Sequence, residues 1–197
     1  MSRNPNPQGK GGSLVLTTLD AQRRAGMAVP PKPIEQVTTE LFTSMFVLES
    51  DFRFKPVPDT PYFLYCQRTG YWLGLTPPAM MGESVGGRFI GTCVLRADMT
   101  WTLELAAEVA ADDEFMADLA ARRARFEQRL ETAETVDQML PVYERDFAFH
   151  RRAAAFAVAH SLKRSMTGAG IAGLSYAQAR ARLGRDDATH DEPGNTP

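Results

Sequence analysis

The hydrophobic period of this chain changes twice, and these changes constrain its fold more than any single motif does. Between Ile34 and Leu48 apolar residues recur at intervals of three and four, which is the spacing of one helix face. The recurring residues are Ile34, Val37, Leu41, Met45 and Leu48. Pro33 stands immediately before them, where proline favours a helix start. We therefore predict an amphipathic helix over 34–48.

From residue 51 to residue 105 the period is two, as in strands with one buried face. The runs are short, rich in β-forming residues and joined by tight turns such as Thr69-Gly70. They predict an antiparallel meander of about four or five strands. Strict alternation in the run 88–95 assigns its residues to opposite faces: Phe89, Gly91, Cys93 and Leu95 on one, and Ile90, Thr92 and Val94 on the other.

After Leu105 the pattern is helical again. Residues 106–131 are rich in Ala, Glu and Arg with sparse apolar positions, which predicts a surface or projecting helix. Residues 136–164 carry a continuous apolar seam, so we expect the two segments to form a helical hairpin. A seam without an equally apolar partner predicts an exposed interface. Its candidate residues are Leu140, Tyr143, Phe147, His150 and Val158.

Together these patterns predict an α+β fold in which a helix packs on an antiparallel sheet and a helical hairpin follows. Pro- and Gly-rich residues 1–33 are expected to form a flexible arm. Residues 34–105 form the helix-plus-sheet domain and 106–166 the hairpin. Residues 167–197 are expected to hold a short helix and a disordered tail.

Composition argues for a soluble protein. With 22 basic and 24 acidic residues, the chain lacks a field that would attract nucleic acid or anionic lipid over its whole surface. A local basic patch stays open. No run approaches the roughly 18 apolar residues of a membrane span, and the N-terminus lacks the apolar core of a secretory signal. We expect a cytoplasmic protein, and abundant Arg and Ala suggest a GC-rich bacterial source.

The two cysteines, Cys66 and Cys93, both fall within apolar strand-like runs. Unpaired buried cysteine behaves as a small hydrophobic residue, so we expect two free thiols. A disulfide between neighbouring strands is the alternative.

Part of the predicted meander resembles an uncharacterised family of bacterial and eukaryotic domains of unknown function. The resemblance covers about residues 54–104 and includes "PYFLYCQRTGYWLGLTPP" and "GRFIGTCVLRADMTWTLE". The matching positions are Tyr62, Leu64, Tyr65, Pro77, Phe89, Gly91, Asp98 and Trp101. The chain departs from the family at 79–82, where Ala-Met-Met-Gly replaces a segment with an acid and a tryptophan. The resemblance implies no function.

One face of the predicted 61–75 hairpin is aromatic. Phe63, Tyr65 and Trp72 alternate with aliphatic positions, and Arg68 and Arg96 lie at neighbouring turns. Burial in the core is the simpler interpretation, because aromatic rings dominate hydrophobic stabilisation. An exposed aromatic face could instead stack the bases of single-stranded nucleic acid or hold a small ligand.

The sequence has no phosphate-binding loop, no metal-ligand spacing and no nucleophile paired with a base. We therefore expect no cofactor and no metal, and we favour a protein without catalytic activity. The leading hypothesis is a protein interaction or assembly module that self-associates or binds a protein partner. Nucleic-acid or small-ligand binding on the aromatic face is the alternative.

Overall fold

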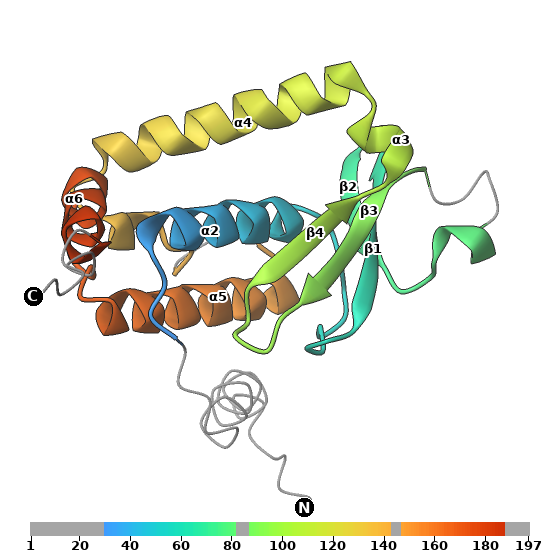
Figure 1. Cartoon of the computed structure of the whole chain (residues 1–197). Helices are drawn as coiled ribbons and strands as arrows, with labels where there is room; N and C mark the ends of the chain where they lie inside the picture. Colours follow the sequence, from blue (N-terminus) through green and yellow to red (C-terminus); the bar gives the residue numbers. More distant parts are fainter. Residues whose placement is uncertain (1–29, 82–86, 143–146, 188–197) are drawn as a thin grey trace, which may run out of the picture.

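The computed structural model describes residues 30–81, 87–142 and 147–187, and it confirms the α+β class (Figure 1). Along the chain the elements are α2 (Ile34–Leu48), β1 (Pro61–Gln67), β2 (Gly70–Gly74), η1 (Pro78–Met80), β3 (Arg88–Leu95), β4 (Trp101–Leu105), α3 (Ala107–Ala110), α4 (Asp113–Thr132), η2 (Val136–Met139), α5 (Phe149–Gly168) and α6 (Tyr176–Asp187). In this part of the chain no helix is both long and apolar enough to cross a membrane.

The sheet has four antiparallel strands in the order β2-β1-β3-β4. Strand β3 pairs with β1 and not with β2, so the order differs from the predicted meander, in which consecutive strands are neighbours. Tyr65 of β1 pairs with Trp72 of β2, and Tyr62 of β1 pairs with Cys93 of β3. At the β2 edge the backbone of Asp51 bonds to Tyr71 and Leu73 at 2.9 and 3.0 Å. These bonds satisfy groups that an open edge would offer to another chain.

The core lies between one side of the sheet and α2. Tyr62, Leu64, Cys93 and Trp101 point to this side and are buried with the apolar face of α2. Ser44 of α2 accepts a hydrogen bond from the Trp101 backbone N–H at 3.0 Å, so the helix also satisfies a group of β4. The inner face of the sheet is therefore sealed.

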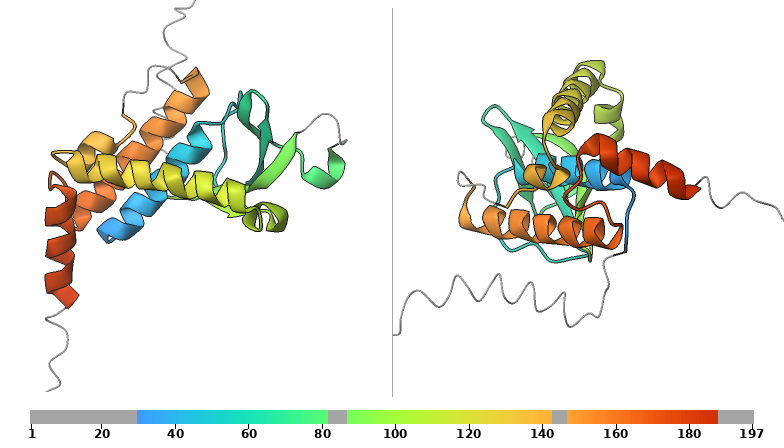
Figure 2. Two further views of the ribbon diagram at one scale, coloured as in Figure 1. Left: turned by 90° about the horizontal axis from the view of Figure 1, so that it is seen from above. Right: turned by 90° about the vertical axis from the view of Figure 1, so that its left-hand side faces the viewer.

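The two long helices after the sheet do not form the expected hairpin against each other. Instead α4 and α5 lie on opposite sides of α2 (Figures 1 and 2). Helix α5 packs closely along α2, and its buried positions include Ala154, Ala157 and Val158, small residues that permit a close approach. Ala154 and Val158 of the predicted seam are therefore part of the core.

The second long helix, α5, begins at Phe149 and not at residue 136 as the apolar seam predicted. Val136–Met139 is a single 3-10 turn, and α5 starts at Phe149. The cause is Pro141, because a proline disfavours the helical conformation of the preceding residue. Leu140 is accordingly extended, with a ψ of 136°.

The predicted faces of β3 are wrong at Phe89, because the strand contains a bulge. Leu64 pairs with Gly91, whereas the next residue, Tyr65, pairs with Phe89. Ile90 is therefore an extra residue in β3, and it is buried. The bulge turns Phe89 away from Cys93 and toward Phe63 and Tyr65, whose rings it contacts.

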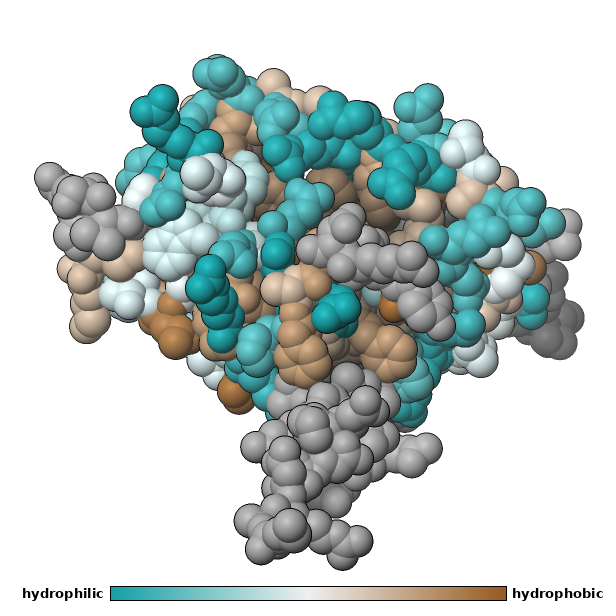
Figure 3. Space-filling model, turned by 180° about the vertical axis from the view of Figure 1, so that it is seen from behind, coloured by the Kyte–Doolittle hydropathy of each residue, from teal (hydrophilic) through white to brown (hydrophobic). Residues whose placement is uncertain are grey.

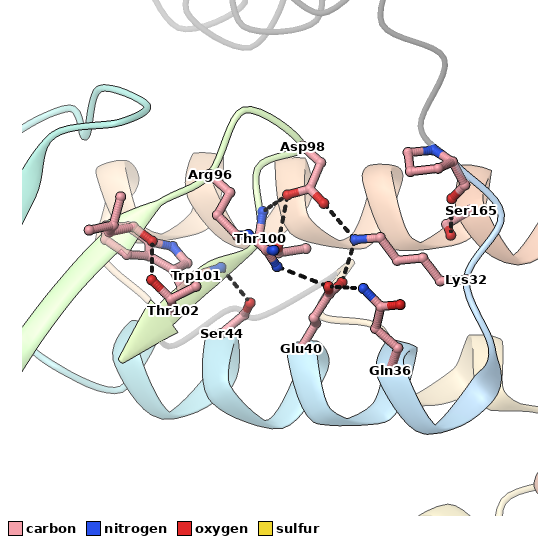
Figure 4. Close-up of polar contacts among 12 residues, drawn as sticks. Lys32, Gln36, Glu40, Ser44, Arg96, Asp98, Thr100, Trp101, Thr102 and Ser165 are labelled. Atoms are coloured by element: carbon pink, nitrogen blue, oxygen red, sulfur yellow. Dashed lines mark hydrogen bonds and ion pairs between the residues drawn. The ribbon is translucent and has the colours of Figure 1, made fainter. Parts of the chain in front are cut away.

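A buried cluster of charges fixes residues 30–33, which we had assigned to the flexible arm. The Lys32 ammonium is 5% exposed and lies 2.6 Å from Glu40 of α2 and 2.5 Å from Asp98 of the β3–β4 turn (Figure 4). Ser165 of α5 donates to the Pro30 carbonyl at 2.8 Å. Residues 1–29 of the predicted arm and the tail beyond 187 lie outside the described residues.

Candidate binding surface on the outer face of the sheet

The side of the sheet that faces away from α2 carries the predicted aromatic residues. We call this side the outer face and define it by Phe63, Tyr65, Trp72, Phe89, Thr92 and Glu104. Residues 63, 92 and 104 are aligned across β1, β3 and β4, so their side chains share one side of the pleat. The long helices α2, α4 and α5 extend from the opposite side (Figure 1).

The four aromatic residues form a continuous layer. The rings of Tyr65 and Trp72 stack with centroids 4.7 Å apart and planes 16° apart. Phe89 lies 5.5 Å from Tyr65 and 6.3 Å from Phe63. Tyr65 is only 1% exposed, whereas Phe63, Trp72 and Phe89 are partly exposed. Tyr65 is thus the base of the layer, and the other three rings form its surface.

Two local features hold this layer in place. The Tyr65 hydroxyl donates to the Thr76 carbonyl at 2.8 Å, and burial raises the pKa of Tyr65, so the phenol remains a neutral donor. The Trp72 ring lies over Gly74, where an added Cβ would come within 2.5 Å of the ring. Gly74 is therefore required for the tryptophan to lie flat against the sheet.

Two strongly exposed apolar residues adjoin the aromatic layer in sequence. Leu75 and Met80 are 62% and 79% exposed, and Thr76, which follows Leu75, is tied to Tyr65. Together with the partly exposed rings of Phe63, Trp72 and Phe89, they give apolar surface that the described parts of the chain leave accessible. Sequence reasoning did not select Leu75, Met80 or Phe89, although Gly91 within a strand is a recognised sign of a bulge.

The two arginines predicted beside the aromatic face have different positions. Arg68 is exposed at the β1–β2 turn. Arg96 pairs with Glu40 of α2 at 3.1 Å, which directs it to the inner side (Figure 4). Arg88 at the start of β3 pairs with Asp112 at 2.7 Å, and Glu104 adds an acid to the outer face. The structure therefore does not place Arg96 beside the rings.

The residues of the predicted seam interface are mostly covered. Leu140 and Val158 are both buried in the core. Val158 lies on α5, which packs along α2, whereas Leu140 follows η2 and precedes that helix. Phe147 is partly buried under Arg151, whose guanidinium carbon lies 5.3 Å from its ring centroid. His150 contacts the ring of Phe149, and Tyr143 lies outside the described residues. Seen from behind, the coloured surface shows apolar patches separated by hydrophilic side chains (Figure 3).

Groups for metal binding or thiol chemistry do not converge in the described ranges. No cluster of three or more His, Cys, Asp or Glu residues there could hold a metal ion. Both cysteines are free, as predicted, and Cys66 pairs in register with Arg88 while Cys93 pairs with Tyr62. Burial raises the pKa of Cys93 to about 12, so this thiol stays protonated at neutral pH.

Comparison with known proteins identifies no relative. No family model, no curated protein and no solved structure matches the chain. The resemblance of residues 54–104 to a domain of unknown function stays a prediction.

Proposed function

We propose that this protein is a non-catalytic interaction module of the cytoplasm that binds a protein partner through the outer face of its sheet. The observation that carries the proposal is the layer of partly exposed rings at Phe63, Trp72 and Phe89 on the outer face. Accessible aromatic and methionine side chains are enriched at protein interfaces, and adjoining apolar patches mark binding sites.

The rigidity of the sheet supports this assignment. Tyr65 is fixed by the stacked ring of Trp72, the tilted ring of Phe89 and a hydrogen bond, so the rings above it are held before a partner arrives. A surface that is ordered in advance loses little conformational entropy on binding. This favours the outer face over the predicted seam of residues 136–164, because its Leu140 and Val158 are already buried in the core.

The test combines capture with a measured affinity. The full chain is used as bait in three forms: wild type, Phe63→Ser/Trp72→Ser, and Met116→Ser as a control at an exposed apolar site on α4. The captured protein is then purified and titrated against each form by calorimetry. Loss of a hot-spot side chain costs at least about 2 kcal/mol, or roughly 30-fold in Kd. Equal Kd values for the three folded forms would rule out the outer face.

Single-stranded nucleic acid is the second candidate for the same surface. The stacked pair Tyr65–Trp72 favours it, because bases stack on such rings. The engagement of Arg96 by Glu40 and the presence of Glu104 weigh against it. Oligonucleotide that quenches Trp72 fluorescence at low salt, with recovery at high salt, would favour nucleic acid over protein.

A further inference from the structure

One edge of the sheet is formed by β4, whose only partner strand is β3 (Figure 1). At one end of this pair the Arg96 N–H donates to the Thr100 carbonyl at 2.8 Å, and at the other the Ala106 N–H donates to the Ile90 carbonyl at 2.9 Å. Because bonded and non-bonded pairs alternate along an antiparallel ladder, positions 102 and 104 also bond to β3. Positions 101, 103 and 105 therefore direct their N–H and C=O groups away from β3.

This edge is closed at its first outward residue and open at the next two. The Trp101 N–H donates to the Ser44 hydroxyl of α2 at 3.0 Å. Within the described ranges no group bonds to the outward N–H and C=O groups of Leu103 and Leu105. The opposite edge of the sheet is occupied by Asp51, which bonds to β2. Strand β4 is therefore the edge that offers its backbone to an added strand.

The side chains along β4 define the strand that fits this edge. Glu104 is exposed on the outer face and has no ion-pair partner among the described residues. Leu103 and Leu105 are partly exposed on the inner side. Directly opposite side chains of paired strands lie about 5 Å apart, where opposite charges attract. A complementary strand therefore has a basic residue opposite Glu104 and apolar residues opposite the two leucines.

An added strand would also continue the outer face. Phe63, Thr92 and Glu104 lie in one row across β1, β3 and β4. Neighbouring strands are about 4.8 Å apart, so a strand beside β4 would lie about 14 Å from β1. A standard interface buries about 800 Å² on each partner, which is enough to include both the rings and the edge.

We propose that the partner of the outer face pairs an extended segment antiparallel to β4, with a basic residue opposite Glu104 and apolar residues opposite Leu103 and Leu105. The inference rests on the proposed function, because it gives the same partner a second contact. In this mode of recognition main-chain hydrogen bonds give affinity, and alternate side chains give specificity.

A peptide titration of the nitrogen-15-labelled full chain tests the pairing. The probe is acetyl-Thr-Val-Arg-Val-Thr-amide, whose two valines fit opposite Leu103 and Leu105. We expect saturable changes in the amide resonances of these two leucines at millimolar peptide. No change, or changes only at β1 and β2, would overturn the inference. The same changes on raising the protein concentration without peptide would assign the edge to a second copy and also overturn it.

Methylated peptides separate edge pairing from apolar adhesion. The N–H groups of both valines would donate to β4, so N-methylation of the two valines should abolish the resonance changes. The N–H of the arginine points away from β4, so N-methylation there should leave the changes in place. Equal binding of the two methylated peptides would contradict strand addition.

A charge exchange tests the role of Glu104. Replacing the arginine of the peptide by glutamate should raise the Kd for the wild type by up to about five-fold. Glu104→Lys should reverse this preference. The same preference in both proteins would overturn the assignment of a basic residue to this position.

These outcomes are distinguishable from those of the proposed function. A partner whose Kd depends on Phe63 and Trp72, with no peptide pairing at β4, would remove the added strand and leave the outer face as the binding surface. Peptide pairing at β4, with no partner that depends on the two rings, would leave the edge as a binding site and remove the proposed function.

Discussion

Lys32 fixes residues 30–33 against α2 and the β3–β4 turn. Its ammonium lies between two acidic side chains, Glu40 and Asp98, and Gln36 and Arg96 bond to Glu40 as well (Figure 4). A lysine just before a helix gives no sign in sequence of being buried, because its partner Asp98 is 66 residues away. This contact was therefore beyond sequence analysis.

Replacing Lys32 by methionine should lower the free energy of unfolding by about 3 kcal/mol, because Glu40 and Asp98 would remain desolvated without their cation. Chemical denaturation measures the loss. Lys163→Met is the matched control, since its ammonium is exposed and lies 3.6 Å from Asp137. That variant should change stability by less than about 1 kcal/mol. Similar losses for both variants would contradict a buried role for Lys32.

The same cluster gives a pH dependence. Burial alone would raise the pKa of Asp98, but hydrogen bonds from Lys32 and Thr100 outweigh it and hold this pKa below its usual value. The carboxylate therefore stabilises the fold above its unfolded-state pKa of about 3.9, and this stabilisation disappears as pH falls through the lower folded-state pKa. The stability difference between wild type and Asp98→Asn should shrink in acid. A constant difference would refute the effect.

Gly91 is the residue that permits close approach of β3 and β4 beside the bulge. A Cβ at this position would come 2.2 Å from the Glu104 carbonyl oxygen, which belongs to the backbone and cannot rotate away. Gly91→Ala should cost about 1–3 kcal/mol, as overpacking does. Gly168→Ala, where the nearest atom is a Pro31 carbon at 3.5 Å, should be tolerated. Thermal unfolding of both variants decides whether backbone contact is the cause.

At the scale of elements, α4 is attached to the body mainly through partly buried residues such as Phe115, Leu119 and Phe126. Leu130 is its one buried residue in the described chain. Between α4 and the body lies Arg122, whose guanidinium carbon is 5.8 Å from the Phe46 ring and 5.7 Å from the Tyr71 ring. It also pairs with Asp118 at 2.9 Å and with Glu49 at 3.2 Å.

Arg122→Ala should loosen α4 selectively. The lost cation–π contacts and partly exposed ion pairs amount to about 1–2 kcal/mol. Hydrogen exchange should become faster in 113–132 while α2 and α5 keep their protection. Arg125→Ala, at an exposed position of the same helix, is the control. Uniformly faster exchange throughout the molecule would show that Arg122 supports the whole core and not α4 in particular.

The elements also show what sequence patterns could and could not predict. The helix Ile34–Leu48 has the predicted bounds, because its apolar spacing and Pro33 act locally. The helix break at Pro141 could have been predicted from the sequence, but the apolar spacing on both sides of the proline favoured a continuous helix. The alternation of apolar residues could not predict that Phe89 lies on the outer face, because the bulge depends on how β3 pairs with β1.

At the scale of the whole molecule, the sheet divides the protein into two unequal sides. One side holds the core and the helices, and the other presents rings around a buried tyrosine. The predicted inequality of the faces is confirmed. The sequence alone predicted Phe63, Tyr65 and Trp72 as outer-face residues. It could not predict that Arg96 pairs with Glu40, because this ion pair depends on how α2 packs against the β3–β4 turn.

In-cell photo-crosslinking tests the outer face as a binding surface most directly. Benzoylphenylalanine is placed at position 63 or at position 116, and irradiated cells are analysed for covalent adducts larger than the 21.8 kDa chain. A partner bound to the outer face gives a discrete protein adduct from position 63 and none from position 116. Adducts from position 116 alone, or from neither position, would contradict the account.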